Sequence, residues 1–124
     1  MSYDPANFKR VEKEIKVSKE SILDEAAAER AFNFMSNNID TLADYEEQYE
    51  LLDTYTKHLV SRLSSAAEGS ESARKRIAES DSQFLQHLEN RAFAKSRFSK
   101  MRELYRIADT RIQMWRTKEA SSRT

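Results

Sequence analysis

The chain has only two histidines, His58 and His87, with which to bind a metal or transfer a proton. They are 29 residues apart, and neither has a second His three to five positions away, the spacing of a helical zinc site. A carboxylate-rich metal site in a helix bundle would place Glu three residues before each His. This chain has Tyr55 and Phe84 there, so we expect no metal and no other cofactor.

The residues for covalent or acid–base catalysis are equally poorly placed. There is no Cys, and no Ser lies in a Gly-flanked turn that would expose it as a nucleophile. The acidic residues Glu46, Glu47, Glu50 and Asp53 share one helix face, but paired carboxylates catalyse only where a pocket separates their pKa values. We interpret them as a solvated face and predict that the protein is not an enzyme.

The basic residues suggest phosphate binding, because Lys and Arg neutralise phosphate groups without reading base sequence. One group flanks the only glycine, Gly69, on both sides. A chain reversal at Gly69 brings its two halves to the same end of a helical hairpin. A solvated turn is the alternative interpretation. The predicted DNA-binding residues are Lys57, Arg62, Arg74, Lys75 and Arg76.

A second basic group follows one face of the C-terminal segment: Arg91, Lys95, Arg102 and Arg106. Aromatic residues are interleaved with it, an arrangement typical of platforms on which unpaired bases stack. Three of them also fit a helix seam, where they would pack in a core. The sequence leaves open whether this face contacts DNA or the acidic segment of a neighbouring subunit. The aromatic residues are Phe93, Phe98, Tyr105 and Trp115.

The composition determines which elements position these residues. One Gly and one Pro in 124 residues cannot supply the turns of a β-sandwich or barrel. An all-α fold is therefore predicted. The hydrophobic fraction is 39% against 34% charged residues, which is little apolar material for a compact monomer of this size. A long helical hairpin or a self-associating helical protein needs less per chain, so we expect a homo-oligomer.

Asp4-Pro5 is typical of a helix start, and Ser36-Asn37-Asn38 of a break. Gly69 predicts the reversal between two long antiparallel helices. We expect one helical domain over 1–124, with an N-terminal helix over 7–36, a second over 39–68, a long third over 72–118 and a frayed tail over 119–124.

Apolar residues spaced alternately by three and four predict a heptad seam that assembles the oligomer. Polar residues interrupt it at 87–92, where the competing stripe Leu85, Leu88 and Ala92 predicts a shift of the seam. The predicted seam residues are Leu42, Tyr45, Tyr49, Leu52, Leu59, Leu63, Phe98, Met101, Tyr105, Ile112 and Trp115.

The net charge is zero but unevenly distributed. Residues 21–57 carry nine acidic and two basic residues, whereas 58–124 carry fourteen basic and eight acidic ones. Such an asymmetry can steer an anionic partner or pair subunits. No apolar run of about 18 residues or signal-peptide core is present, so we expect no membrane span and a cytoplasmic protein.

Several short motifs, in order, make the chain similar to the UvsY-like recombination mediators of phages. Asp24-Glu25-Ala26-Ala27 resembles the family's Glu-Ala-Ala segment. Leu59-Val60-Ser61-Arg62-Leu63 stands where the family has Leu-Lys-Ala-Arg-Leu. A Ser/Gly turn and a basic helix containing Ser80 follow, and the end of the long last helix, Ala108 to Arg116, also fits the family.

The resemblance implies a ring-shaped homo-oligomer that binds single-stranded DNA without sequence preference. It further implies that the protein loads a recombinase onto DNA covered by single-strand-binding protein, in the bacterial host cytoplasm if the chain is phage-encoded. The family's DNA-binding Arg corresponds to Arg62, whereas its Lys position holds Val60. The alternative is a structural or adaptor coiled coil, such as a phage scaffold or chaperone, without a nucleic-acid role.

Overall fold

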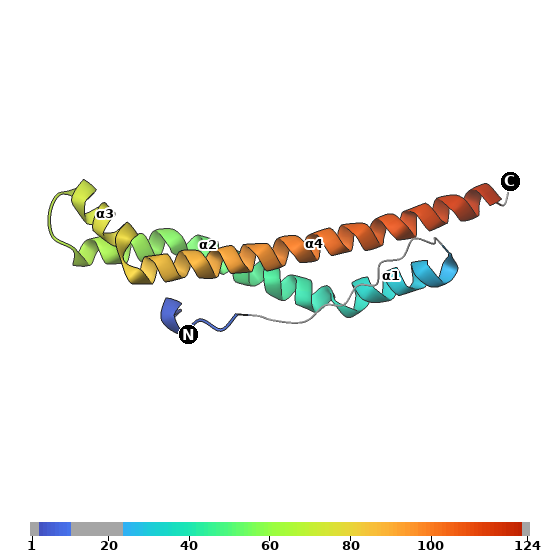
Figure 1. Cartoon of the computed structure of the whole chain (residues 1–124), viewed down its shortest axis with the longest axis horizontal. Coiled ribbons are helices and arrows are strands. Elements are labelled where there is room, and N and C mark those ends of the chain that lie inside the picture. The colour runs from blue at the N-terminus through green and yellow to red at the C-terminus, as the bar shows by residue number, and fades with distance from the viewer. Residues whose placement is uncertain (1–2, 11–23, 123–124) are drawn as a thin grey trace. The chain divides into compact units, whose positions relative to one another are not determined.

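The computed structural model describes residues 3–10 and 24–122, and helices make up most of this part of the chain (Figure 1). No strand occurs within these two ranges, which confirms the predicted all-α class. The elements in chain order are the 3-10 turn η1 (Pro5–Asn7) and the helices α1 (Glu25–Asn37), α2 (Ile39–Ala66), α3 (Glu71–Ser80) and α4 (Ser82–Ser122).

The N-terminal helix predicted over 7–36 is only partly present. Residues 25–36 belong to α1, whereas residues 8–10 lie outside any helix and 11–23 lie outside the described residues. Asp24 caps α1 by accepting a hydrogen bond from the Ala27 amide at 2.7 Å, which satisfies a donor that the first turn leaves free. The predicted break is found at Asn38, between α1 and α2.

The prediction of one long helix over 72–118 is wrong in one respect, because the chain forms two helices there, α3 and α4, which are separated at Asp81. Asp81 has an extended backbone (ψ 140°), and its carboxylate accepts a hydrogen bond from the Gln83 amide at 2.8 Å. It therefore ends one helix and caps the next. The predicted tail is also corrected, because α4 continues to Ser122.

The chain divides into two compact units. The first contains Met1–Val11 and Tyr45–Arg97, with most of α2, all of α3 and the start of α4. Within it, partners on α4 come earlier as the α2 residue number rises, so the two helices run antiparallel. The pairs are Asp53–Arg91 at 3.7 Å, Thr56–His87 at 2.9 Å and Arg62–Gln83 at 3.2 Å.

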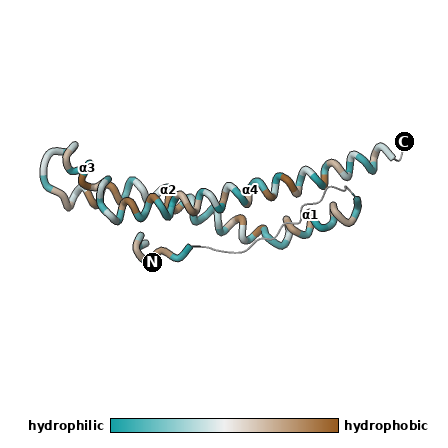
Figure 2. The backbone as a smooth tube through the Cα atoms, in the orientation of Figure 1, coloured by the Kyte–Doolittle hydropathy of each residue, from teal (hydrophilic) through white to brown (hydrophobic). Residues whose placement is uncertain are grey.

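The buried apolar positions of α2 repeat every seven residues: Tyr45, Leu52 and Leu59 are at most 3% exposed. Figure 2 shows the corresponding alternation of apolar and polar residues along the helices. Four predicted seam residues, these three and Met101, are thus buried within one chain, and the other seven are partly buried.

On α4 the same repeat runs through His87, Ala94, Met101 and Ala108, all at most 5% exposed. The predicted shift of the seam is therefore wrong, since the polar His87 stays in register. Leu85, from the competing stripe, is 52% exposed.

The second unit contains Glu12–Asp44 and Phe98–Thr124. Its described part pairs α1 with the end of α4. The Tyr105 hydroxyl donates a hydrogen bond to the Met35 carbonyl at 2.5 Å, and the rings of Tyr105 and Phe34 are 5.7 Å apart. Ala27, Ala28 and Ala31 are buried, and such small side chains allow a helix to approach its neighbour closely. None of the described helices is long and apolar enough to cross a membrane.

Candidate nucleic-acid interface

The turn between α2 and α3 positions the predicted basic group. Gly69 has a φ of 114°, a conformation that side chains disfavour. Ser70 then caps α3: its hydroxyl accepts from the Ala73 amide at 3.3 Å, and its carbonyl accepts from the Arg74 amide at 2.9 Å. The chain reversal predicted at Gly69 thus sets Arg74 and Lys75 in the first turns of α3.

A surface pocket of about 330 Å³ lies where α3 faces the last turns of α2. Two cations and one carboxylate border it, so its charged groups sum to one positive charge. The hydroxyl groups of Ser61 and Ser64, from α2, add donors that hydrogen-bond anions, whereas the Ser65 hydroxyl donates to the Ser61 carbonyl at 2.8 Å. The lining residues are Val60, Ser61, Ser64, Ser65, Glu71, Arg74 and Lys75.

Arg74 is the most informative residue of this pocket. Its Nε is fully buried and makes no hydrogen bond within residues 3–10 and 24–122. A buried guanidinium N–H without an acceptor costs stability, and an anion in the pocket would remove that cost once the side chain turns to expose the N–H. Lys75 is exposed and lies 3.9 Å from Glu79, a surface ion pair that contributes little.

The structure separates the remaining members of the predicted group. Arg62 is turned toward Tyr55 and Gln83, with hydrogen bonds of 3.3 and 3.2 Å to their side-chain oxygens. Lys57 lies one helical turn before Ser61, on the stripe of α2 that borders the pocket. Arg76 is exposed on α3 and does not line the pocket. Arg74 and Lys75 are therefore the predicted pair that the fold brings together.

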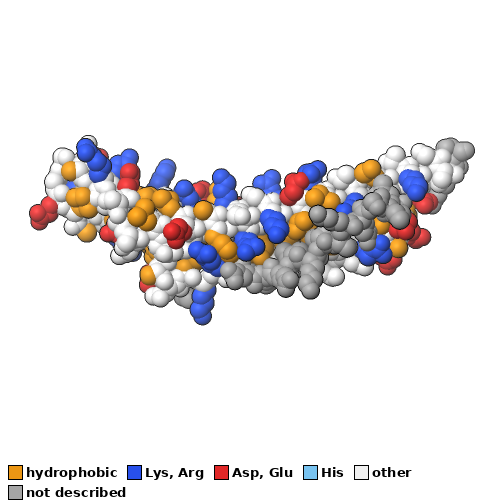
Figure 3. Space-filling model, viewed as in Figure 1, with side chains coloured by type: hydrophobic (Ala, Val, Ile, Leu, Met, Phe, Trp, Pro, Cys, Tyr) orange, Lys and Arg blue, Asp and Glu red, His pale blue; other side chains and the backbone are white. Residues whose placement is uncertain are grey.

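The second basic group is partly engaged within the chain. Arg91 donates to Thr56 at 3.2 Å and lies 3.7 Å from Asp53. Arg106 pairs with Glu103, and this hydrogen bond lowers the pKa of the Glu103 carboxyl. Figure 3 nevertheless shows Lys and Arg side chains recurring along α4 on the visible face.

A buried polar cluster, which the sequence did not predict, holds the N-terminal segment on α2 and α4. The Tyr3 hydroxyl lies 3.0 Å from His87 Nδ1 and accepts from Asn90 Nδ2 at 3.0 Å. Asn90 also donates to the Pro5 carbonyl at 3.1 Å. His87 and Asn90 are at most 1% exposed. Polar side chains at positions of the apolar seam were the sequence feature that could have indicated this buried cluster.

His87 is neutral in this cluster. Burial lowers its pKa below 6.5, and the positive charge of Arg91 lowers it further. Thr56 donates to the Leu52 carbonyl at 3.2 Å, so its oxygen is free to accept from His87 Nε2 at 2.9 Å. His87 Nδ1 then accepts from the Tyr3 hydroxyl. The other histidine, His58, is exposed and its ring centroid lies 5.1 Å from that of Tyr55.

The docked segment also carries Arg10 to the ring of Phe93. The guanidinium carbon of Arg10 lies 4.5 Å from the ring centroid, and that of Arg97 lies 4.9 Å from it. Phe93 is half-buried. Sequence spacing alone did not predict this arrangement, because Arg10 and Phe93 are 83 residues apart.

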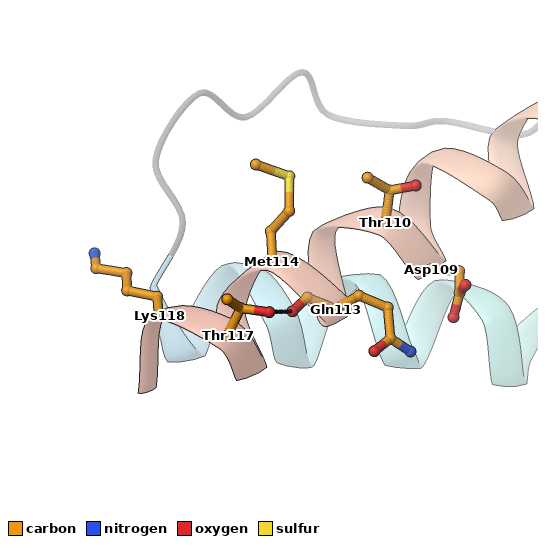
Figure 4. A pocket seen from close by; sticks show the side chains of 6 residues that line it. All are labelled: Asp109, Thr110, Gln113, Met114, Thr117 and Lys118. Carbon is orange, nitrogen blue, oxygen red and sulfur yellow. Dashed lines mark hydrogen bonds between the residues drawn. The ribbon is translucent and has the colours of Figure 1, made fainter. Parts of the chain in front are cut away.

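A second pocket, of about 460 Å³, lies in the other unit (Figure 4). All its described lining residues come from α4, and Thr117 donates to the Gln113 carbonyl at 3.0 Å. Asp109 and Lys118 oppose each other in charge, so this pocket does not favour an anion. Within the described ranges, no group of three or more His, Cys, Asp or Glu could hold a metal ion.

A scan against protein-family models and searches of curated proteins and solved structures found no match to this chain. The similarity to UvsY-like mediators therefore rests on the sequence motifs alone.

Proposed function

We propose that this protein is a non-enzymatic single-stranded DNA-binding protein whose phosphate contacts centre on the pocket between α2 and α3. The observation that carries the proposal is the buried Nε of Arg74, which has no acceptor among the described residues. A phosphate oxygen in the pocket would supply that acceptor once the Arg74 side chain turns toward it, since charge-assisted hydrogen bonds to Arg are strong and directional.

The rest of the pocket supports a phosphate ligand. Ser61 and Ser64 line it beside Arg74 and Lys75, and hydroxyl groups commonly share phosphate contacts with cations. Glu71 keeps the net charge low, so a single pocket binds weakly. Repetition of the pocket in a homo-oligomer would raise the overall affinity, because later contacts become intramolecular.

The proposal extends to self-association, as a ring if the resemblance holds. Two large apolar side chains of the first unit, Leu51 and Leu85, are 64% and 52% exposed. In that assembly the protein would help load a recombinase onto DNA covered by single-strand-binding protein, in the cytoplasm of a bacterial host. The recombinase role rests on the motifs that resemble UvsY-like mediators.

The second candidate function is a structural or adaptor coiled coil, such as a phage scaffold or chaperone. The heptad repeats of buried residues on α2 and α4 favour it, because they account for the fold without any nucleic acid. A chain of this kind would have no affinity for DNA.

Charge variants of the pocket test the proposal. Fluorescence anisotropy would follow a labelled oligothymidine of about 30 nucleotides at about 50 mM salt. If Arg74 and Lys75 each contact a phosphate, Arg74→Ala with Lys75→Ala should weaken binding about 50-fold for each pocket that the strand engages. Glu71→Gln should strengthen binding, since it removes the opposing carboxylate.

Lys100→Ala with Arg116→Ala is the matched control, because it removes the same charge from two exposed positions of α4. It should weaken binding much less than the pocket variant. Equal losses in the two double variants would contradict a specific pocket, and wild-type protein that does not bind at low salt would support the structural alternative.

A further inference from the structure

The aromatic ring of Phe93 has two cations close to it within the first unit. Arg10 and Arg97 place their guanidinium carbons 4.5 and 4.9 Å from its centroid. Arg10 is exposed, whereas Arg97 and Phe93 are half-buried. Two positively charged groups thus lie close to one ring, whereas a cation–π contact needs only one.

The position of Arg10 is determined by the N-terminal segment. Asn90 donates to the Pro5 carbonyl and the Tyr3 hydroxyl, and the rings of Tyr3 and Phe8 are in edge contact at 5.7 Å. Hydrogen bonds at Tyr3 and Pro5 therefore hold the N-terminal segment on α4, and the segment then continues to Arg10 beside Phe93. Arg97, in contrast, lies on α4 itself, one helical turn after Phe93.

The contact with Arg10 is easily exchanged. An exposed cation–π contact contributes about two- to fivefold to an equilibrium constant. A nucleobase stacked on an aromatic side chain contributes about 5- to 150-fold. A base can therefore displace the exposed Arg10 with a net gain, and the released guanidinium remains close enough to neutralise a flanking phosphate.

We infer that Phe93 is a stacking site for an unpaired base of single-stranded DNA, with Arg97 retained at the ring and Arg10 displaced onto the backbone. The inference rests on the proposed function and adds the base contact that phosphate binding lacks. It also predicts preference for single strands, because the bases of a duplex are stacked on one another and do not offer a free face.

An abasic oligonucleotide separates stacking from phosphate binding, since it has the same backbone charge and no bases. We expect wild-type protein to bind oligothymidine at least about fivefold more tightly than the abasic strand. Phe93→Ala should abolish that preference and leave abasic binding unchanged. Phe98→Ala is the matched control, because Phe98 also carries a guanidinium, that of Arg102, at 5.4 Å; it should retain the preference.

A tryptophan probe gives a second readout that does not depend on removing the ring. In a Trp115→Phe background, the Phe93→Trp substitution would introduce the only tryptophan of the chain. Oligothymidine should quench its fluorescence, whereas Phe98→Trp in the same background should show no quenching.

Equal affinity of the wild type for both strands, with no quenching in the Phe93→Trp variant, would overturn the stacking site. The proposal of phosphate binding would be unaffected by that result. Absence of binding to either strand would overturn both proposals. Quenching by oligothymidine together with a lost preference in Phe93→Ala would support the stacking site.

Discussion

His87 shows how one buried side chain links the N-terminal segment to the helical pair. Its ring is fully buried and lies between the hydroxyls of Tyr3 and Thr56. The charged groups near it are Arg91 and, beyond Arg91, Asp53. A protonated ring would have to remain desolvated close to the Arg91 guanidinium, so the folded protein favours the neutral form.

This arrangement predicts a loss of stability in weak acid. Because folding lowers the pKa of His87 below 6.5, the unfolded chain binds the proton more readily. The stabilisation is complete above pH 6.5 and falls as the pH drops below that value toward the lowered pKa. Urea unfolding at about pH 7.5 and pH 5.5 measures the difference.

His87→Gln is the control for that measurement, because its amide is polar and does not titrate. The variant should lose part of the decrease between the two pH values. An unchanged decrease would assign the effect to carboxylates elsewhere in the chain.

Tyr3 allows a test of the same cluster by removal of one oxygen. Tyr3→Phe keeps the ring contacts but removes the hydrogen-bond partner of His87 Nδ1 and one of the two acceptors of Asn90 Nδ2, so we expect a loss of about 1–3 kcal/mol in the free energy of unfolding. Tyr55→Phe is the matched control: its hydroxyl accepts only an exposed hydrogen bond from Arg62 among the bonds described above. Similar losses in both variants would contradict a specific role for the Tyr3 hydroxyl.

At the scale of the elements, Asp81 determines where α3 ends and α4 begins. Asp81→Ala should lower the free energy of unfolding by about 1 kcal/mol, because the Gln83 amide loses its acceptor. Asp81→Asn should retain most of that energy, since Asn caps helices as well. Thermal unfolding of the wild type and the two variants tests this. If Asp81→Ala were as stable as the wild type, the cap at Asp81 would contribute nothing to the free energy of unfolding.

The helices were largely predictable, because their signals are local. The heptad repeat predicted Tyr45, Leu52 and Leu59 as one side of a packed seam, and Gly69 predicted the reversal. The division at Asp81 was missed because good helix formers surround Ser80-Asp81-Ser82 and obscure its capping signal. The seam shift was wrongly predicted because a polar residue such as His87 was not expected to be buried.

The candidate site was predictable only in part, for a physical reason. Arg74 and Lys75 follow the turn in sequence, so a helical hairpin necessarily places them near α2. Which way Arg62 points depends on Gln83 and Tyr55, side chains that no local pattern connects to it. The stacking of Arg10 on Phe93 likewise depends on contacts between distant segments.

At the scale of the whole molecule, the zero net charge argues against nonspecific attraction to DNA as the basis of binding. Affinity must then come from local groups such as the pocket of Arg74 and Lys75, repeated in an oligomer. Light scattering of wild-type protein should give a mass of several chains, each of 14.5 kDa. A monomeric mass would remove the repetition on which the proposed affinity depends.

The most direct test of the central claim is the salt dependence of single-stranded DNA binding by the wild-type protein. With about six phosphates contacted per oligomer, the affinity should fall about 300-fold between about 50 and 200 mM salt. Arg74→Ala with Lys75→Ala should flatten that dependence. Binding that is absent at low salt, or that does not change with salt, would contradict phosphate recognition by this protein.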